Sequence, residues 1–278
     1  MGEALSEPQA WGSALHSIES QRSQGPQSGL TDPSVDIEGN LRRYLADRDA
    51  SARYASFDYC FNFFQTYRDQ NELPALFQGD ALQTACLQIG FYLASWGMFR
   101  GSTDLLQRSA RVFVPLVEVI VNAAPEIWEV DAHNYGRAGC QIVFDTARQI
   151  RAALPGVASD TLVTKIMLAT FGCVPAFDSN FKRGAGLWTF SPRALRALGE
   201  FHNRNAEAIE RYRMQTLDFD SAAPTSRRYP RAKVIDMIFF VAGAPDDLSE
   251  PHVRHRTART AGPRTAHSQD APAGNIAV

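Results

Sequence analysis

The chain is poor in lysine and has no excess of basic charge. Only three of its 28 basic residues are lysines, at Lys165, Lys182 and Lys233, and the others are arginines. The 30 acidic residues bring the formal net charge to -2. The strongly basic balance that would indicate a nucleic-acid partner is therefore absent, although charge can still be local. We attribute the many arginines and alanines to a GC-rich, bacterial-looking coding sequence rather than to selection for phosphate contacts.

Paired cysteine motifs are also missing. The four cysteines, Cys60, Cys86, Cys140 and Cys173, are far apart and lie in apolar contexts. Without a C-x-x-C pair, neither a zinc site nor an iron–sulfur cluster is expected. Four buried free thiols are typical of a protein in a reducing cytoplasm. We therefore expect a cytoplasmic protein with no metal and no cofactor.

Membrane and nucleotide motifs are absent as well. The apolar run from Ala110 to Ala124 is interrupted by Arg111, Pro115 and Glu118, so it is too short and too charged to span a membrane. The first residues are polar and contain no secretory signal core. The absence of P-loop, G-x-G-x-x-G and G-x-S-x-G patterns leaves nucleotide-binding and serine-hydrolase classes without support.

What is present is helical periodicity. In residues 51–71 five aromatic residues recur at three- and four-residue spacing and form one stripe, at Tyr54, Phe57, Phe61, Phe64 and Tyr67. We interpret this stripe as core rather than as a base-stacking surface. Further helices are predicted at 36–47, 81–99, 104–124, 136–154, 160–172, 191–215 and 231–243. No alternating strand pattern occurs, and residues 224–230 are predicted to form a polar loop. The fold class is therefore all-α, as a multi-helix orthogonal bundle.

The predicted helix at 81–99 is apolar almost all round, so we expect it to be central and buried on most sides. Its row of small residues, Gly90, Ala94 and Gly97, would let another helix approach closely. Residues 1–30 are rich in Ser, Gln, Gly and Pro and are predicted to be a disordered leader. Residues 31–244 form a single globular domain, and residues 245–278 a disordered tail whose arginines either contact nucleic acid or are simply solvated.

The most informative stretch runs from Leu154 to Gly184. Pro155 and Gly156 predict a tight turn after one helix, and Ser159 or Asp160 is placed to cap the next. That helix ends at Gly172, and an apolar crossing leads to Asp178 at the start of a further helix. A carboxylate is favoured at a helix N-terminus. Two interpretations remain open: a DNA-binding hairpin with a catalytic carboxylate, or two core helices joined by a turn, with Asp178 as a helix cap.

This stretch resembles the signature of helix-hairpin-helix DNA glycosylases of the endonuclease III type. The hairpin is matched by Leu154–Val157, the Phe-Gly helix end by Phe171-Gly172, and the catalytic aspartate by Asp178, without a gap. The resemblance covers about thirty residues, from Leu154 to Arg183. It implies that backbone N–H groups of the hairpin bind a DNA phosphate and that a base is flipped into a pocket. The aspartate would then activate the nucleophile and stabilise positive charge on the sugar.

On this resemblance the catalytic residue is Asp178. The DNA-binding residues are Pro155, Gly156, Val157 and Ala158 in the hairpin, with Lys165, Lys182 and Arg183 as nearby phosphate contacts. Two departures matter. Ala158 stands where the family has a second hairpin glycine, and Asp160 stands where bifunctional members have a nucleophilic lysine, so Schiff-base chemistry is not expected.

The sequence thus predicts a helix-hairpin-helix-like DNA-binding protein that is either a monofunctional glycosylase or an inactive relative. The alternative is a non-catalytic helical domain that binds a protein partner or a second copy of itself. Two histidines, His133 and His202, lie within the predicted globular domain. His133 is a candidate general base, although a cap at Asn134 is favoured, and His202 is expected to be solvated.

Overall fold

The computed structural model describes residues 35–100 and 104–245. The predicted leader and nearly all of the predicted tail therefore lie outside the described residues. The α-helices are α2 (Ile37–Ala46), α3 (Ala55–Asp69), α4 (Ala81–Ser95), α5 (Val114–Val121), α6 (Arg137–Ala153), α7 (Asp160–Thr170), α8 (Ser179–Ala185), α9 (Pro192–Arg204), α10 (Ala206–Arg211) and α11 (Arg231–Ala242). Short 3₁₀ turns occupy Leu73–Phe77, Asp104–Gln107, Ala110–Phe113, Pro125–Glu129 and Ala132–Asn134.

The predicted all-α class is confirmed, with one small difference. Strands β1 (Gln215–Leu217) and β2 (Pro224–Arg228) pair antiparallel, with Gln215 opposite Arg228 and Leu217 opposite Pro224. Part of the predicted polar loop is thus a strand. The pair is held against α3, where the Asp58 carboxylate accepts a hydrogen bond from the Leu217 N–H at 2.8 Å.

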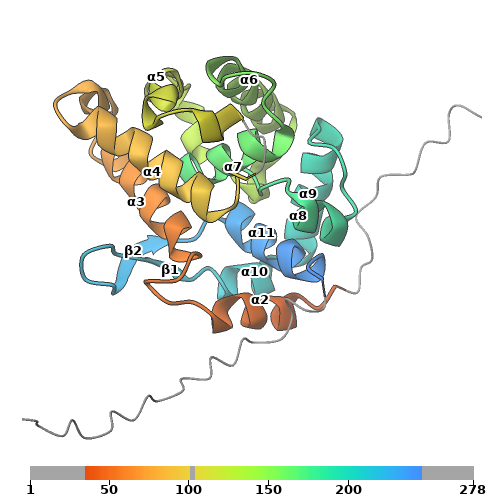
Figure 1. Cartoon of the computed structure of the whole chain (residues 1–278). Helices are drawn as coiled ribbons and strands as arrows, with labels where there is room; N and C mark the ends of the chain where they lie inside the picture. The colour runs from red at the N-terminus through yellow and green to blue at the C-terminus, as the bar shows by residue number, and fades with distance from the viewer. Residues whose placement is uncertain (1–34, 101–103, 246–278) are drawn as a thin grey trace, which may run out of the picture.

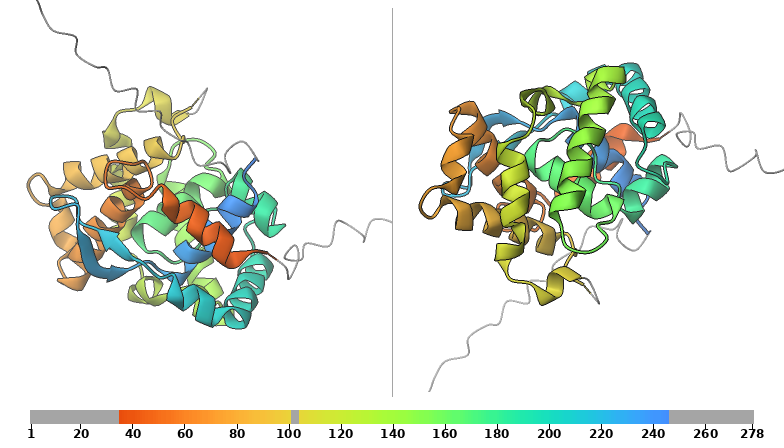
Figure 2. Two further views of the ribbon diagram at one scale, coloured as in Figure 1. Left: turned by 90° about the horizontal axis from the view of Figure 1, so that it is seen from below. Right: turned by 90° about the horizontal axis from the view of Figure 1, so that it is seen from above.

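Helix α7 lies near the centre of the molecule, with α3 and α4 on one side, α5 and α6 above, α8 and α9 on the other side, and α11 below (Figure 1). Every residue from Leu162 to Thr170 is buried. Figure 2 shows the same arrangement from below and above, with α2 and α11 side by side at the lower face. No helix in the described ranges has the length and apolar character needed to cross a bilayer.

Helix boundaries follow local signals where those signals are strong. Asp36 caps α2 through a hydrogen bond from the Gly39 N–H, and Ser191 caps α9 ahead of Pro192. Two predicted long helices are interrupted. The segment 104–124 forms two 3₁₀ turns and α5, and the segment 191–215 breaks at Asn205 into α9 and α10. The second break is accompanied by a hydrogen bond from the Asn205 side-chain amide to the Phe201 carbonyl.

The aromatic stripe of α3 is core, as expected, since Phe57, Phe61 and Phe64 are each no more than 4% exposed. All four cysteines are free and buried, and burial raises the pKa of the Cys60 and Cys173 thiols.

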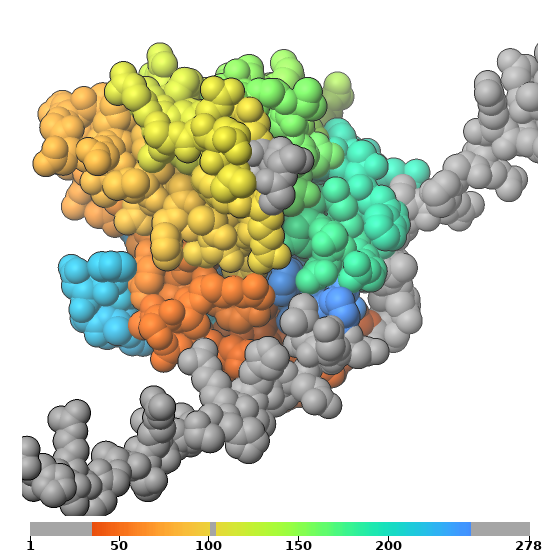
Figure 3. Space-filling model, viewed as in Figure 1, coloured from red at the N-terminus to blue at the C-terminus, as the bar shows by residue number. Residues whose placement is uncertain are grey.

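Helix α4, which was predicted to be buried on most sides, has one exposed face: Leu87 and Phe91 are exposed to solvent by 51% and 70%. Figure 3 shows α4, in gold, at the front surface of the molecule.

Candidate functional site

The hairpin between α6 and α7 is open to solvent. Gly156 has φ +64°, a conformation that favours glycine, and a Cβ added there would meet nothing within 4 Å. Val157 is fully exposed at the tip of the turn. Ser159 caps α7 by accepting a hydrogen bond from the Leu162 N–H at 3.2 Å. The backbone of the turn is therefore accessible to a ligand directly ahead of a helix N-terminus.

Three consecutive backbone N–H groups of this hairpin have no hydrogen-bond acceptor in the described part of the chain: those of Gly156, Val157 and Ala158. They precede the first turn of α7, whose own N–H groups carry the positive end of the helix dipole. Unpaired N–H groups at such a position form a ready site for an anion.

The base of the hairpin is fixed from inside. Ala158 is 3% exposed, so its methyl group packs in the core. The Ala158 carbonyl accepts a hydrogen bond from Arg151, whose other nitrogen lies 2.8 Å from Asp160 Oδ1. The departure from glycine at this position therefore places no side chain on the outer face of the turn.

The crossing from α7 to α8 is held by two threonines of α7. Thr161 donates a hydrogen bond to the Phe177 carbonyl, and Thr164 accepts one from the Phe177 N–H, both at 2.8 Å. Before the crossing, Gly172 turns the chain with φ +72°, and a Cβ there would lie 2.5 Å from Pro230. These contacts fix the backbone immediately before Asp178.

Asp178 makes two interactions with the protein. Its Oδ1 accepts a hydrogen bond from the Phe181 N–H at 3.0 Å, so it caps α8 as the helix-cap interpretation expects. Its Oδ2 lies 2.9 Å from Lys165 Nζ. The two side chains are 15% and 4% exposed, respectively, so the pair is largely withdrawn from water. The Asp178 side chain keeps a small exposed surface.

A second ion pair lies close to the first, on α11. Lys233 Nζ is 3.0 Å from Asp236 Oδ2 and also donates to the Tyr44 hydroxyl at 3.0 Å. The Trp96 ring connects the two pairs, with the ammonium groups of Lys165 and Lys233 at 5.0 and 5.4 Å from its centroid. Cation–π attraction of this kind stabilises buried ammonium groups. We call this set of residues the Trp96 cluster: Tyr44, Trp96, Lys165, Asp178, Lys233 and Asp236.

The electrostatics of the Trp96 cluster are visible in the neighbouring tyrosine. Tyr92 is fully buried, and its pKa is raised well above the usual value first by desolvation and then by the carboxylates of Asp236 and Asp178. Burial and the negative charge of Asp236 both oppose ionisation of the Tyr92 phenol. The Trp96 indole N–H is buried without an acceptor among the described residues.

The structure brings together only some of the residues predicted to contact DNA. The four hairpin residues lie at one turn. Lys165, however, is buried, and its ammonium group forms an ion pair with Asp178. Lys182 is half-buried on α8. Arg183 is exposed and donates hydrogen bonds to the Gly243 carbonyl and to Asn180. A direct phosphate contact by Lys165 is thus incompatible with this arrangement.

Sequence reasoning did not identify Trp96, Lys233 or Asp236 as members of the site. A signal existed: two of the chain's rare lysines occur within apolar helical runs, and Asp236 follows Lys233 by one helical turn.

The expectation that His202 is solvated is wrong, since His202 is 5% exposed and its Nε2 has no partner in the described ranges. His133 is exposed, and Asp131, rather than Asn134, caps the turn there, while the Asn134 side chain accepts from the Asp131 N–H.

Comparisons with protein-family models, curated proteins and solved structures find no significant match for this chain. The site is therefore interpreted from its own geometry: an open hairpin able to accept an anion, and a buried, ion-paired carboxylate on the next helix.

Proposed function

We propose that the protein binds DNA through the hairpin Pro155–Ala158, with the backbone N–H groups donating to a phosphate. The observation that carries the proposal is the run of three unpaired N–H groups at Gly156, Val157 and Ala158 in front of α7. The open space around Gly156 allows close approach of a phosphate oxygen. Four free cysteines fit a cytoplasmic location for this activity.

Asp178 is the proposed catalytic residue. It begins the helix after α7, its backbone is fixed by Thr161 and Thr164 through Phe177, and part of its side chain is exposed to solvent. In base release, a carboxylate at this position would stabilise positive charge developing on the deoxyribose and orient the attacking water. The N–C1′ bond breaks with its electron pair leaving on the base, water supplies the oxygen of the new C1′–O bond, and the proton that the water loses ends on the released base.

Binding is tested by fluorescence anisotropy with a duplex that carries an abasic-site analogue, measured across a range of salt concentrations. We expect binding that weakens with salt. Gly156→Glu should weaken it about tenfold or more, because the carboxylate repels the phosphate at the hairpin. Gly79→Glu is the matched control, since Gly79 also has positive φ and no atom within 4 Å of an added Cβ. No binding at low salt, or equal loss in both variants, would overturn the hairpin as the phosphate site.

Catalysis is tested by base release from duplexes with damaged or mismatched bases. We expect release by the unaltered protein and none by Asp178→Asn, whereas Asp145→Asn on the exposed face of α6 should keep the activity. Circular dichroism at the assay temperature separates loss of chemistry from loss of fold. Release by a folded Asp178→Asn protein would exclude Asp178 as the catalytic group, and absence of release by the unaltered protein would leave DNA binding as the function.

A further inference from the structure

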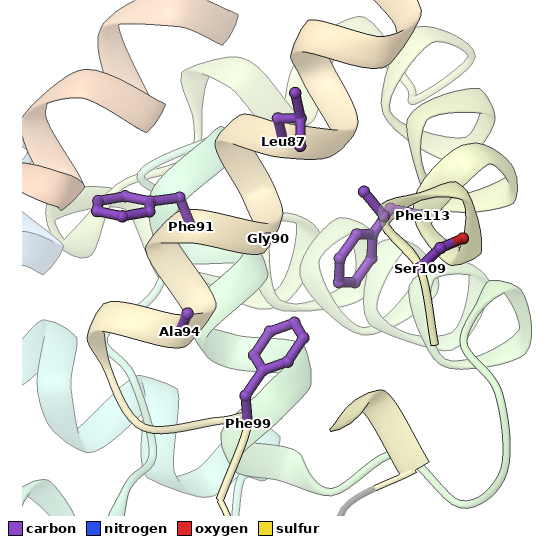
Figure 4. Close-up of a pocket in the computed structure, with 8 residues that line it drawn as sticks. Leu87, Gly90, Phe91, Ala94, Phe99, Ser109 and Phe113 are labelled. Atoms are coloured by element: carbon purple, nitrogen blue, oxygen red, sulfur yellow. The ribbon is translucent and has the colours of Figure 1, made fainter. Parts of the chain in front are cut away.

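An apolar groove of about 380 Å³ lies between α4 and the turn Ala110–Phe113. Its lining residues are Leu87, Gly90, Phe91, Ala94, Phe99, Ser109, Ala110 and Phe113. Figure 4 shows Phe99 and Phe113 pointing into the space beside Gly90. Phe91, which also lines the groove, is 70% exposed, so no other described residue covers it. Exposed apolar surface of this kind is typical of a binding site.

One end of the groove carries the positive charge of Arg111. This arginine is exposed on the turn that forms one wall of the groove, and it has no ion-pair partner among the described residues. It lies near Cys86, which precedes the first α4 residue of the groove: burial raises the pKa of the Cys86 thiol, and Arg111 opposes part of that rise.

The other end carries the positive charge of Arg100, which is also exposed and without an ion-pair partner in the described ranges. Its guanidinium group lies over Gly97, directly after α4, since a Cβ added to Gly97 would be 2.8 Å from Arg100 Nε. The neighbouring charges, Asp104 and Arg108, pair with each other at 3.3 Å. The groove therefore suits an apolar segment that has an acidic group at each end.

One segment of the predicted leader has this pattern. Its apolar residues recur with helical periodicity, at Ala10, Trp11, Ala14, Leu15 and Ile18. Trp, Leu and Ile at positions i, i+4 and i+7 have the spacing with which an amphipathic helix places its anchors in an apolar groove. Pro8 stands just ahead of them, where the first turn of a helix tolerates proline.

The same segment is acidic at both ends. Glu7 precedes the apolar pattern and Glu19 follows it, with no Lys or Arg between them. Twelve residues of helix separate the two carboxylates by about 18 Å along the axis. Cys86 and Gly97, which mark the positions of the two arginines, are eleven residues apart, or about 17 Å. The spacing of the acidic residues therefore matches the spacing of the arginines.

The segment is also tethered closely enough to reach the groove. Residues 20–34 connect it to the described domain and can extend to about 50 Å, whereas a domain of this size has a radius of gyration of about 17 Å. A tether of this length gives an effective concentration on the order of 1 mM. A second copy of the α4 face would instead bring the same two arginines to the contact, and like charges oppose each other.

We propose that residues 7–19 bind as an amphipathic helix in the α4 groove of the same chain, with Trp11 as the central anchor and with Glu7 and Glu19 facing the two arginines. This proposal does not depend on DNA binding, because it uses neither the hairpin nor Asp178.

Hydrogen exchange of the full chain, read by mass spectrometry at residues 7–19, tests the proposal. A helix this short is marginal in isolation, so slow exchange requires docking. We expect exchange about tenfold slower than in an unstructured peptide, as a dissociation constant of about 0.1 mM for the untethered segment would give. Trp11→Ser and Phe91→Ser should each restore the unstructured rate, whereas Phe219→Ser, which alters a 73% exposed residue on the β1–β2 loop, should not.

Fast exchange in the unaltered chain would overturn the proposal and leave a segment of another protein as the occupant of the groove. Slow exchange that either Trp11→Ser or Phe91→Ser leaves unchanged would overturn it as well. Slowing that increases between about 1 and 100 μM protein would show that the segment comes from a second copy, and would overturn the contact within one chain.

A charge exchange tests the orientation of the segment without altering the apolar contact. Glu7→Arg with Glu19→Arg should abolish the slow exchange, and so should Arg100→Glu with Arg111→Glu. The four substitutions together should restore it, because the opposite charges then meet again. Arg193→Glu with Arg196→Glu, at exposed positions of α9, is the control and should have no effect. Failure of the fourfold variant to restore slow exchange would overturn the pairing of these acidic residues with the arginines of the groove.

Discussion

The hairpin Leu154–Ser159 and the Trp96 cluster are joined by α7, but they differ in whether their polar groups have partners within the protein. In the hairpin, three backbone N–H groups are unpaired within the described chain, and two of them belong to the exposed residues Gly156 and Val157. In the Trp96 cluster, both lysines and both aspartates are buried or nearly so and are paired with each other. The hairpin can therefore exchange partners without cost to the fold, whereas each charge of the cluster is part of the fold. Substitutions should distinguish the two regions by their effects on stability.

The largest effect is expected for Asp178→Asn. The amide can still cap α8, but the Lys165 ammonium, 4% exposed, loses its counter-charge. Removing one partner of a buried ion pair costs about 3–5 kcal/mol of unfolding free energy. Urea denaturation measures the loss, and Asp145→Asn, whose ion pair with Arg148 is exposed, should change stability by less than about 1 kcal/mol. Equal values for the two variants would show that Asp178 and Lys165 do not form a buried pair.

Lys165→Met should cost less than Asp178→Asn, because the remaining carboxylate is 15% exposed and retains some hydration. The double variant sharpens the comparison. If the two charges depend on each other, the loss in Lys165→Met with Asp178→Asn should fall short of the sum of the single losses by about 1–3 kcal/mol. The measurement is a double-mutant cycle from denaturation curves, and strict additivity would contradict the pairing.

Ser159 lies at the start of α7, between the two regions, and Ser159→Ala should lower the free energy of unfolding by an intermediate amount. Its hydroxyl accepts from the Leu162 N–H at the start of α7, and loss of such a cap costs about 1 kcal/mol. Ser179→Ala is the control, since Ser179 is exposed at the first position of α8, after the Asp178 cap. Thermal unfolding should separate the two variants by a few degrees, and indistinguishable melting temperatures would show that the cap does not stabilise α7.

The smallest effect is expected for Val157→Ser at the hairpin tip. Val157 is fully exposed, so the substitution removes no buried contact and should change stability by less than about 0.5 kcal/mol. Calorimetry against the unaltered protein measures the difference. A loss above about 1 kcal/mol would mean that the tip packs on the molecule, and the distinction between the hairpin and the cluster would fail.

The sequence predicted the parts of this site that depend on neighbours along the chain. The turn at Gly156, the cap at Ser159, the helix end at Gly172 and the helix start at Asp178 all follow from local backbone chemistry, and the structure has each of them. The cluster could not be predicted in this way. Lys165 meets Asp178 because the segment after α7 turns back along that helix, where Thr161 and Thr164 hold Phe177. Trp96 reaches both lysines from the end of α4, far away in sequence.

The missed elements have similar physical reasons. The β1–β2 pair is short and mostly exposed, so it carries little apolar pattern, and it is positioned by Asp58 and Asn62 on α3. Helix α4 was predicted to be central and buried on most sides, because apolar content alone does not tell a buried helix face from an exposed one. The sequence shows that α4 has no charged residue. Which side of α4 is exposed depends on how the other helices pack against it, and this cannot be read from composition.

The burial of α7 has a consequence for the time scale of local opening. Amide protons from Leu162 to Thr170 sit in a helix buried at every one of these positions, so they should exchange with solvent deuterium only through global unfolding. The amide protons of Gly156, Val157 and Ala158 have no acceptor within the described chain and should exchange near the rate of an unstructured peptide. Amide exchange times would then change from seconds in the hairpin to hours in α7 within about one and a half helical turns of the chain. Slowing of the three hairpin amides by a bound nucleic acid would be visible against a helix that hardly exchanges at all.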